Sequence, residues 1–330
     1  MNHQHVYHHG IPGFLRECME TSLIQRLKSV GMNCGCEYTA FPRFADMDSY
    51  SRYDHSIGVA LIVWHFTRDR KQAIAGLLHD VASPVFAHVV DFMRGDYLTQ
   101  ESTEDGTETL IAGSTELQAV LGKCGLTTDD VCDYHRYPIA DNDSPLLSAD
   151  RLEYTIGNSI NYGFCTIGDA RRFYDDLVIG TNEYGVDELM FKDAQIADAF
   201  VNAALACSKV YVSDEDRYAM QLLSEILGHA MEQQVIEEDD LYSTEPEVIG
   251  KLLSDGRTAS LWNGFCAYRR TTSAPQPGAT GCWRKVVAKK RYIDPVVQGR
   301  GRMSELSPSF ADSLSAFRNS SQDYWICGHR

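Results

Sequence analysis

The sequence reads SRYDH at residues 51–55, LLHD at 77–80 and FAHVVD at 86–91. These three segments are rich in imidazoles and carboxylates, the side chains that bind metals or move protons. His79 and Asp80 directly follow the apolar run 73–78, so we expect them at the end of a buried helical segment. A buried carboxylate without a partner is costly, and this pair therefore requires a cation or a hydrogen-bond network.

Two further candidate ligands lie in other segments with helical patterns. His55 begins one of these apolar segments, and Asp150 lies within another, much later in the chain. Arg52 precedes His55 by three residues, so the two side chains share one face of a helix. His55, His79, Asp80 and Asp150 together offer two imidazoles and two carboxylates. Mixed nitrogen and oxygen ligands suit one divalent Mn, Fe, Co, Ni or Zn ion better than calcium.

The order of these four residues resembles the HD-domain metal-dependent phosphohydrolases. Within that superfamily the local sequence is most similar to the deoxynucleoside triphosphate triphosphohydrolase branch, in segments 51–59, 77–81, 86–88 and 150–154. The resemblance implies an all-α fold in which separate helices supply the ligands. We therefore expect a mainly helical bundle, a small β hairpin within 179–191, and an irregular, partly β C-terminal region.

The resemblance also implies a proton donor. His88 follows His79 by nine residues and Asp91 follows His88 by three, as do the catalytic His and Asp of the triphosphohydrolase branch. The i, i+3 spacing would let the carboxylate orient the imidazole and raise its pKa. We predict that His88 protonates the leaving oxygen and that Arg52 stabilises the phosphate. The alternatives are a buried histidine packed between helices for His88 and a surface salt bridge for Arg52.

Substrate contacts are expected on the helix that carries Asp150. Tyr154 and Asn158 follow Asp150 by four and eight residues, so they lie on the face of the metal ligand. The resemblance implies that Tyr154 contacts a sugar, and the alternative is a tyrosine in the core. A second metal near His88 and His135 is the alternative to a single ion. The lack of an adjacent histidine pair favours one ion.

The sequence departs from the triphosphohydrolase branch at two places. Ala82-Ser83 stands where the branch has Gly-His, and Gln100-Glu101 stands where it has His-Glu. All four metal ligands are nevertheless retained. The pattern therefore predicts metal binding without requiring the release of triphosphate.

The expected function is that of a metal-dependent phosphohydrolase acting on a nucleotide. The resemblance implies a deoxynucleoside triphosphate triphosphohydrolase-like reaction, in which a metal-activated hydroxide attacks a phosphate ester. One alternative is an HD-type phosphatase or 5′-nucleotidase that acts on monophosphates or on another phosphoester. A second alternative is a non-catalytic HD protein that binds a nucleotide.

Composition limits the partners of the protein. The chain has 330 residues, of which 44% are apolar, and a net charge of −16. Such a length allows a large core, and the acidic charge argues against a protein that coats nucleic acid. With no apolar leader and no run of about 18 apolar residues, the sequence predicts a soluble cytoplasmic protein that contacts no membrane.

The C-terminal part contains one concentrated basic segment. Residues 284–302 hold seven Arg or Lys and one acidic residue. This basic tail would bind a substrate phosphate or neutralise an acidic neighbour in a homo-oligomer, which we expect the chain to form. We predict a helical core over 1–240, with the ligand helices within about 49–158, and accessory helices with the basic tail over 241–330.

The apolar pattern also predicts individual elements. We expect helices over 11–31 and near 108–121, and a long helical region over about 193–236. Pro84 predicts a bend or a new helix start between residues 81 and 85. A further helix pair is expected after residue 246, and the apolar residues within 286–293 suggest a strand.

Overall fold

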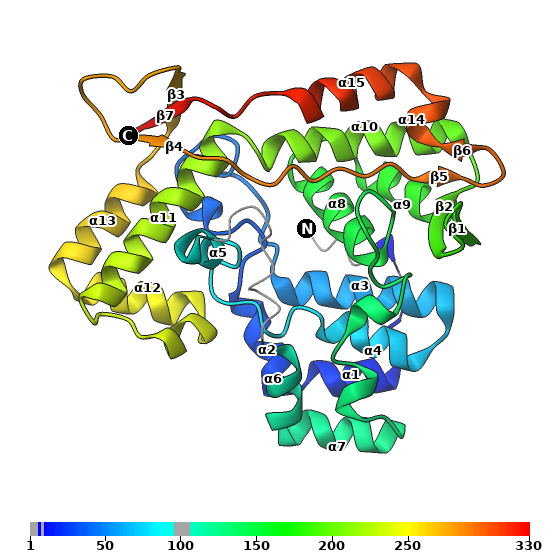
Figure 1. Cartoon of the computed structure of the whole chain (residues 1–330). Coiled ribbons are helices and arrows are strands. Elements are labelled where there is room, and N and C mark those ends of the chain that lie inside the picture. Colours follow the sequence, from blue (N-terminus) through cyan, green and yellow to red (C-terminus); the bar gives the residue numbers. More distant parts are fainter. Residues whose placement is uncertain (1–5, 8–9, 96–105) are drawn as a thin grey trace.

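The computed structural model describes residues 6–7, 10–95 and 106–330 of the chain. Helices form most of it, and the two small sheets lie at opposite ends of the view in Figure 1. The predicted fold class, mainly helical with a small β region, is therefore confirmed. Among the described residues, no helix is both long enough and apolar enough to cross a membrane. Gln100-Glu101 lies outside the described residues.

The N-terminal helices are α1 (Gly13–Met19), α2 (Ser22–Arg26), α3 (Arg52–Thr67) and α4 (Arg70–Leu78). The single helix that the sequence predicted over 11–31 is wrong in extent. Its break lies at Thr21, whose hydroxyl donates to the Cys18 carbonyl at 2.7 Å before α2 begins. The start of α3 is fixed by a capping box in which Ser51 and Asp54 each accept a hydrogen bond from the other's backbone N–H.

The chain leaves α4 after Leu78 and enters α5 (Val89–Arg94) eleven residues later, so the predicted break around Pro84 is confirmed. In this turn Phe86 and Ala87 are buried and have left-handed φ angles of 58° and 47°. Such angles are costly for residues with a Cβ atom. Surrounding contacts hold the turn, because the Phe86 N–H donates to Glu245 Oε1 at 3.2 Å.

The middle of the chain contains α6 (Thr107–Gly113), α7 (Thr115–Cys124), α8 (Ala149–Asn161) and α9 (Ile167–Asp175). Strands β1 (Leu177–Thr181) and β2 (Asp187–Phe191) follow and pair antiparallel, which confirms the predicted hairpin. The helix predicted near 108–121 is divided into α6 and α7. Ser114 causes the division, since its side chain caps α7 by accepting from the Leu117 N–H.

The long helical region predicted over 193–236 consists of α10 (Ala194–Val210) and α11 (Asp214–Glu232). Ser213 caps the start of α11 by accepting from the Asp216 N–H. The predicted helix pair that follows is present as α12 (Glu245–Ser254) and α13 (Gly256–Cys266). Short 3-10 helices are η2 (Leu27–Ser29), η3 (Cys36–Tyr38), η4 (Thr128–Asp130), η5 (Tyr134–Arg136) and η6 (Glu238–Tyr242).

The C-terminal region completes both sheets. It contains β3 (Arg270–Ala274), β4 (Trp283–Lys285), β5 (Val296–Val297), β6 (Gly301–Arg302), α14 (Met303–Leu306), α15 (Pro308–Asn319) and β7 (Trp325–His329). One sheet has the order β1-β2-β5-β6 and the other β3-β7-β4. The strand predicted through residues 286–293 is wrong, because β4 ends at Lys285. The segment from β4 to β5 instead crosses the molecule without strand partners (Figure 1).

The buried apolar side chains form two clusters. One gathers residues of α3, α4, α8 and α10, and it includes Phe310 and Leu314 of α15. The other gathers residues of α5, α11, α12 and α13, and it includes Phe41 and Phe86. Each cluster takes residues from both sides of residue 240, and the domain boundary placed there stays a prediction.

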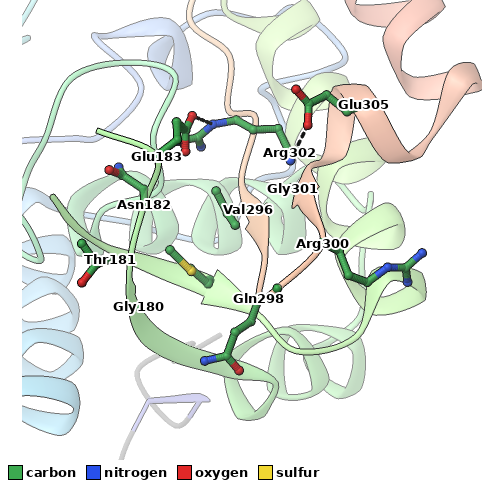
Figure 2. A pocket seen from close by; sticks show the side chains of 12 residues that line it. Gly180, Thr181, Asn182, Glu183, Val296, Gln298, Arg300, Gly301, Arg302 and Glu305 are labelled. Carbon is green, nitrogen blue, oxygen red and sulfur yellow. Dashed lines mark hydrogen bonds and ion pairs between the residues drawn. The ribbon is translucent and has the colours of Figure 1, made fainter. Parts of the chain in front are cut away.

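Arg302 ties β6 to the hairpin. Its guanidinium donates to Glu183 (Figure 2). It also donates to Glu188, which is fully buried. Arg302 and Glu183 border a cavity of about 410 Å³ between the hairpin and residues 296–305. Because Arg302 pairs with Glu183 in the hairpin turn and with Glu188 in β2, this contact joins the C-terminal segment to the hairpin.

Replacing Arg302 should therefore destabilise the fold. In Arg302→Ala the buried Glu188 carboxylate loses its cation, and we expect the free energy of unfolding to fall by about 3–5 kcal/mol. Urea denaturation followed by circular dichroism measures this change. Arg300→Ala, at an exposed position two residues earlier, is the control. A loss below about 1 kcal/mol in Arg302→Ala would show that the ion pair is not needed.

Candidate metal centre and active site

The four predicted metal ligands meet in the structure. His55 comes from α3, His79 and Asp80 follow the end of α4, and Asp150 lies in the first turn of α8. His55 Nε2 lies 3.1 Å from His79 Nε2 and 3.0 Å from Asp150 Oδ1, and His79 Nε2 lies 3.5 Å from Asp80 Oδ2. Ligand atoms about 2.1 Å from a shared ion lie roughly 3.0–3.4 Å apart. The observed separations are close to this range.

The electrostatics of the cluster favour a cation at its centre. Burial lowers the pKa of His55, but hydrogen bonds to Asp150 and Glu153 outweigh it and raise the pKa to about 10. Burial raises the pKa of Asp80, but the charges of Arg52, His79 and His55 outweigh it and hold the pKa well below its usual value. His55, His79 and Asp80 are all buried and are suited to hold a metal ion. The residues present therefore fit the ion that the sequence predicts.

Each imidazole is oriented by a hydrogen bond at its other nitrogen. His79 Nδ1 lies 2.7 Å from the Gly76 carbonyl, and His55 Nδ1 lies 2.5 Å from Glu153 Oε2. Both Nε2 atoms are thereby directed into the cluster, as is typical of histidines that bind metals. Sequence reasoning gave no role to Glu153. Its only signal is its place one helical turn after Asp150.

Glu153 is fully buried between α3 and α8. It also accepts a hydrogen bond from the Tyr50 hydroxyl. Gly58 makes room for it, because a Cβ atom at Gly58 would lie 2.5 Å from Glu153 Cγ. The glycine therefore allows the carboxylate to reach the far side of His55.

Arg52 contacts Asp80, one of the predicted metal ligands, directly. One of its terminal nitrogens, Nη1, donates to both oxygens of Asp80 at 2.8 Å. Arg52 is buried, so the surface salt bridge considered as an alternative is wrong. Its Nε has no hydrogen-bond partner among the described residues. A contact with substrate phosphate stays a prediction.

His88 and Asp91 form the predicted pair. His88 Nδ1 lies 2.9 Å from Asp91 Oδ2, and Asp91 is fully buried while the His88 side chain is 24% exposed. Asp91 raises the pKa of His88 as expected, but the net shift is downward. Burial lowers this pKa, the hydrogen bond to Asp91 opposes it, and the charges of Arg291 and Arg52 lower it further. His88 is therefore mostly neutral near pH 7 in the free protein.

These side chains share a cavity of about 640 Å³, a size typical of small-molecule sites. The metal ligands line it together with Arg52, His88, Tyr154 and Asn158. The rings of Tyr154 and Tyr211 meet edge to face at 6.3 Å. Tyr154 and Asn158 thus lie where the sequence placed them, and their contacts with a substrate stay predictions.

The basic tail contributes residues 288–292 to the cavity wall. Several of its cations, Lys290 included, have partners within the chain. Arg284 pairs with Glu225, Lys285 with Asp323, and Lys290 donates to the carbonyls of Arg318 and Ser320. The charge of Arg291 acts on His88 and lowers its pKa, so this guanidinium lies near the cavity. Of the two roles considered for the tail, phosphate binding is the one that this position favours.

Ser83, which differs from the triphosphohydrolase branch, and His135, considered as a ligand of a second metal, both contact carboxylates. Ser83 Oγ donates to Asp80 Oδ1 at 2.9 Å, so a serine supports a metal ligand where the triphosphohydrolase branch has a histidine. His135 Nδ1 lies 2.9 Å from Asp141 Oδ2, and its side chain is 52% exposed. His135 is therefore directed to a carboxylate outside the four-ligand cluster.

No protein-family model matches the chain. It is 29% identical over 250 residues to the uncharacterized protein YdhJ of Bacillus subtilis (74% of this chain, 72% of YdhJ). It is 22% identical over 289 residues to the metal-dependent phosphohydrolase cns2 of Cordyceps militaris (87% of this chain, 81% of cns2). A phosphohydrolase of Bacteroides thetaiotaomicron has a similar crystal structure, with a TM-score of 0.69 and 16% identity over 97% of both chains.

The structural similarity shows a shared fold over nearly the whole chain. Together with the relative named a metal-dependent phosphohydrolase, it supports the resemblance to the HD-domain phosphohydrolase superfamily. These relatives do not bear on the triphosphohydrolase branch, which stays a hypothesis.

Glu153→Gln should weaken metal binding. The amide lacks the negative charge that holds His55 Nδ1–H, and loss of such a supporting contact typically costs 10–100-fold in metal affinity. Calorimetric titration of the metal-free protein with Mn²⁺ measures the change without relying on activity. Glu232→Gln, whose side chain is 78% exposed, is the matched control. An unchanged affinity in Glu153→Gln would contradict the orienting role.

Proposed function

We propose that the protein is a metal-dependent phosphohydrolase that acts on a nucleotide. The observation that carries this proposal is the meeting of two imidazoles and two carboxylates in a cavity that His88 also lines, with Asp91 behind it. The similarity to cns2 supports the reaction type. The cations Arg52 and Arg291 beside the cluster are suited to an anionic substrate.

The reaction uses the residues around the cluster. His55, His79, Asp80 and Asp150 would hold a divalent ion, which when bound would supply Lewis acidity toward phosphate oxygens. Arg52, held by Asp80, lies where its charge stabilises a phosphate next to the metal ligands. His88, oriented by Asp91, donates a proton to the leaving oxygen.

A phosphatase or 5′-nucleotidase that acts on monophosphates is the second candidate. Ser83 favours the phosphatase, because this serine stands where the triphosphohydrolase branch has a histidine. Its hydroxyl donates a hydrogen bond to Asp80. The non-catalytic alternative has less support. A protein that only binds nucleotide has no need of the oriented proton donor that His88 and Asp91 form.

The experiment is hydrolysis of a nucleotide panel, from triphosphate to monophosphate, with Mn, Fe, Co, Ni or Zn added. Triphosphate as product would support the triphosphohydrolase-like reaction, and orthophosphate alone would support the phosphatase. Ribose 5-phosphate and p-nitrophenyl phosphate test simpler phosphoesters. Failure to hydrolyse any of these compounds with any metal would contradict the proposal.

His88→Ala should separate catalysis from metal binding. His88 does not belong to the ligand cluster, so we expect unchanged Mn²⁺ affinity and turnover slowed by roughly a hundredfold or more. In Asp80→Ala a ligand is lost, and metal binding and activity should disappear together. Full activity in His88→Ala would show that another group protonates the leaving oxygen.

The pH dependence should reveal the lowered pKa of His88. A general acid works in its protonated form, so kcat/KM should fall as the pH rises through this pKa, which lies below the ordinary value of about 6.5. In His88→Gln this decrease should be absent. A decrease that persists unchanged in His88→Gln belongs to another group and would contradict the assignment.

A further inference from the structure

The cavity continues beyond the metal ligands to a second polar wall. Asn33, Asn158, Tyr162, Tyr211 and Asp216 line this part. Asn33 lies in the loop after η2, Asn158 lies in α8, and Tyr162 directly follows α8. Tyr211 directly follows α10, and Asp216 lies in the first turn of α11. Of these elements, only α8 also carries a predicted metal ligand, Asp150.

In this wall, the side-chain amide of Asn158 has only part of its hydrogen-bonding capacity satisfied. Its side chain is 4% exposed and its Nδ2 donates to the Tyr211 hydroxyl at 2.9 Å. Its Oδ1 is buried and has no hydrogen-bond partner among the described residues. If the amide is turned over, the nitrogen is left instead. A buried polar atom in this state is costly unless a ligand completes its bonding.

Asp216 is an 8% exposed carboxyl that also faces this cavity. The Cys36 thiol, a weak donor, lies 3.6 Å from its Oδ2. The neighbouring Arg217 turns elsewhere, since it donates to Asp214 and to the Val286 carbonyl. Burial raises the pKa of Asp216 to about 8. Near pH 7 the side chain is mostly protonated and presents an O–H donor beside a carbonyl acceptor.

The other groups of this wall are neutral. The Tyr162 hydroxyl donates to Asn33 Oδ1 at 3.1 Å, which fixes the asparagine. The wall adjoins Arg52 through Cys34, which lies close to both Arg52 and Asp216. Burial raises the pKa of the Cys34 thiol, the charge of Arg52 opposes this rise, and Asp216 adds to it. A phosphate would find no cation in the wall itself, whereas an uncharged polar group would find donors and acceptors.

We propose that Asn33, Asn158 and Asp216 form a recognition subsite for an uncharged planar group with a hydrogen-bond donor beside an acceptor, as on the edge of a nucleobase. The inference rests on the proposed function, because a phosphate at the metal cluster leaves the remainder of a nucleotide in this part of the cavity. The flanking rings of Tyr154, Tyr162 and Tyr211 offer apolar surface to such a group.

The kinetic test compares substrates with and without a base. In Asp216→Ala we expect kcat/KM for the preferred nucleotide to fall at least tenfold and that for ribose 5-phosphate to stay unchanged. Asp216→Asn keeps a neutral donor beside an acceptor and should stay within threefold of the original protein. Glu232→Ala removes an exposed carboxylate from the same helix and is the control. An equal loss for both substrates in Asp216→Ala would indicate a merely structural role and overturn the subsite.

The binding test does not depend on catalysis. Calorimetric titration with inosine and cytidine, which carry no phosphate, should give heat that is lost in Asp216→Ala and kept in Asp216→Asn. If the phosphate esters are hydrolysed but neither nucleoside binds, the subsite is wrong and the proposed function stands. If no ester is hydrolysed but nucleosides bind through Asp216, the subsite stands and the phosphohydrolase proposal fails.

Discussion

The structure depends on one constraint: several carboxylates lie close together and largely shielded from water. Asp80 and Glu153 are buried and Asp150 is only partly exposed, all beside His55. Carboxylates placed so closely at low exposure are stable only when cations and hydrogen-bond donors face them. This requirement brings together α3, the end of α4 and α8, which are far apart in sequence. Arg52, Tyr50 and Ser83 supply the donors, and the centre is left to a metal ion.

The site also depends on the C-terminal half of the chain. The left-handed turn before His88 would not persist alone, since two consecutive residues with a Cβ atom adopt costly φ angles. Backbone donors of this turn reach the Leu241 carbonyl at 2.7 Å and Glu245 Oε1 at 3.2 Å. The second buried cluster packs α5 against α11 and α12 in the same region. The position of His88 is therefore fixed by helices that carry none of the four predicted metal ligands.

The sequence predicted those features that local pattern determines. His55, His79, Asp80 and Asp150 could be found because each adjoins an apolar helical segment. The breaks at Thr21, Ser114 and Ser213 were missed because the helical spacing of apolar residues continues across each of them. Only a single polar residue at the start of the next helix marks the break. The false strand over 286–293 has strand-like residues but no neighbouring strand. Glu153, Asp216 and the lowered pKa of His88 depend on tertiary contacts, such as that between His55 and Glu153, 98 residues apart.

The cavity has a positively charged part near the predicted metal ligands and a neutral polar part near α11, and the fold of the chain explains this division. Around the metal cluster, Arg52 and Arg291 provide positive potential that suits phosphate and keeps His88 mostly neutral. At α11 the cation that could have ionised Asp216 is Arg217, and the C-terminal sheet region binds it through Val286 and Tyr324. Arg217 makes no ion pair with Asp216, and burial outweighs the remaining effect of its charge and favours the neutral form of Asp216. The same tail that brings Arg291 to the phosphate side thus removes a cation from the opposite wall, and one segment sets both characters.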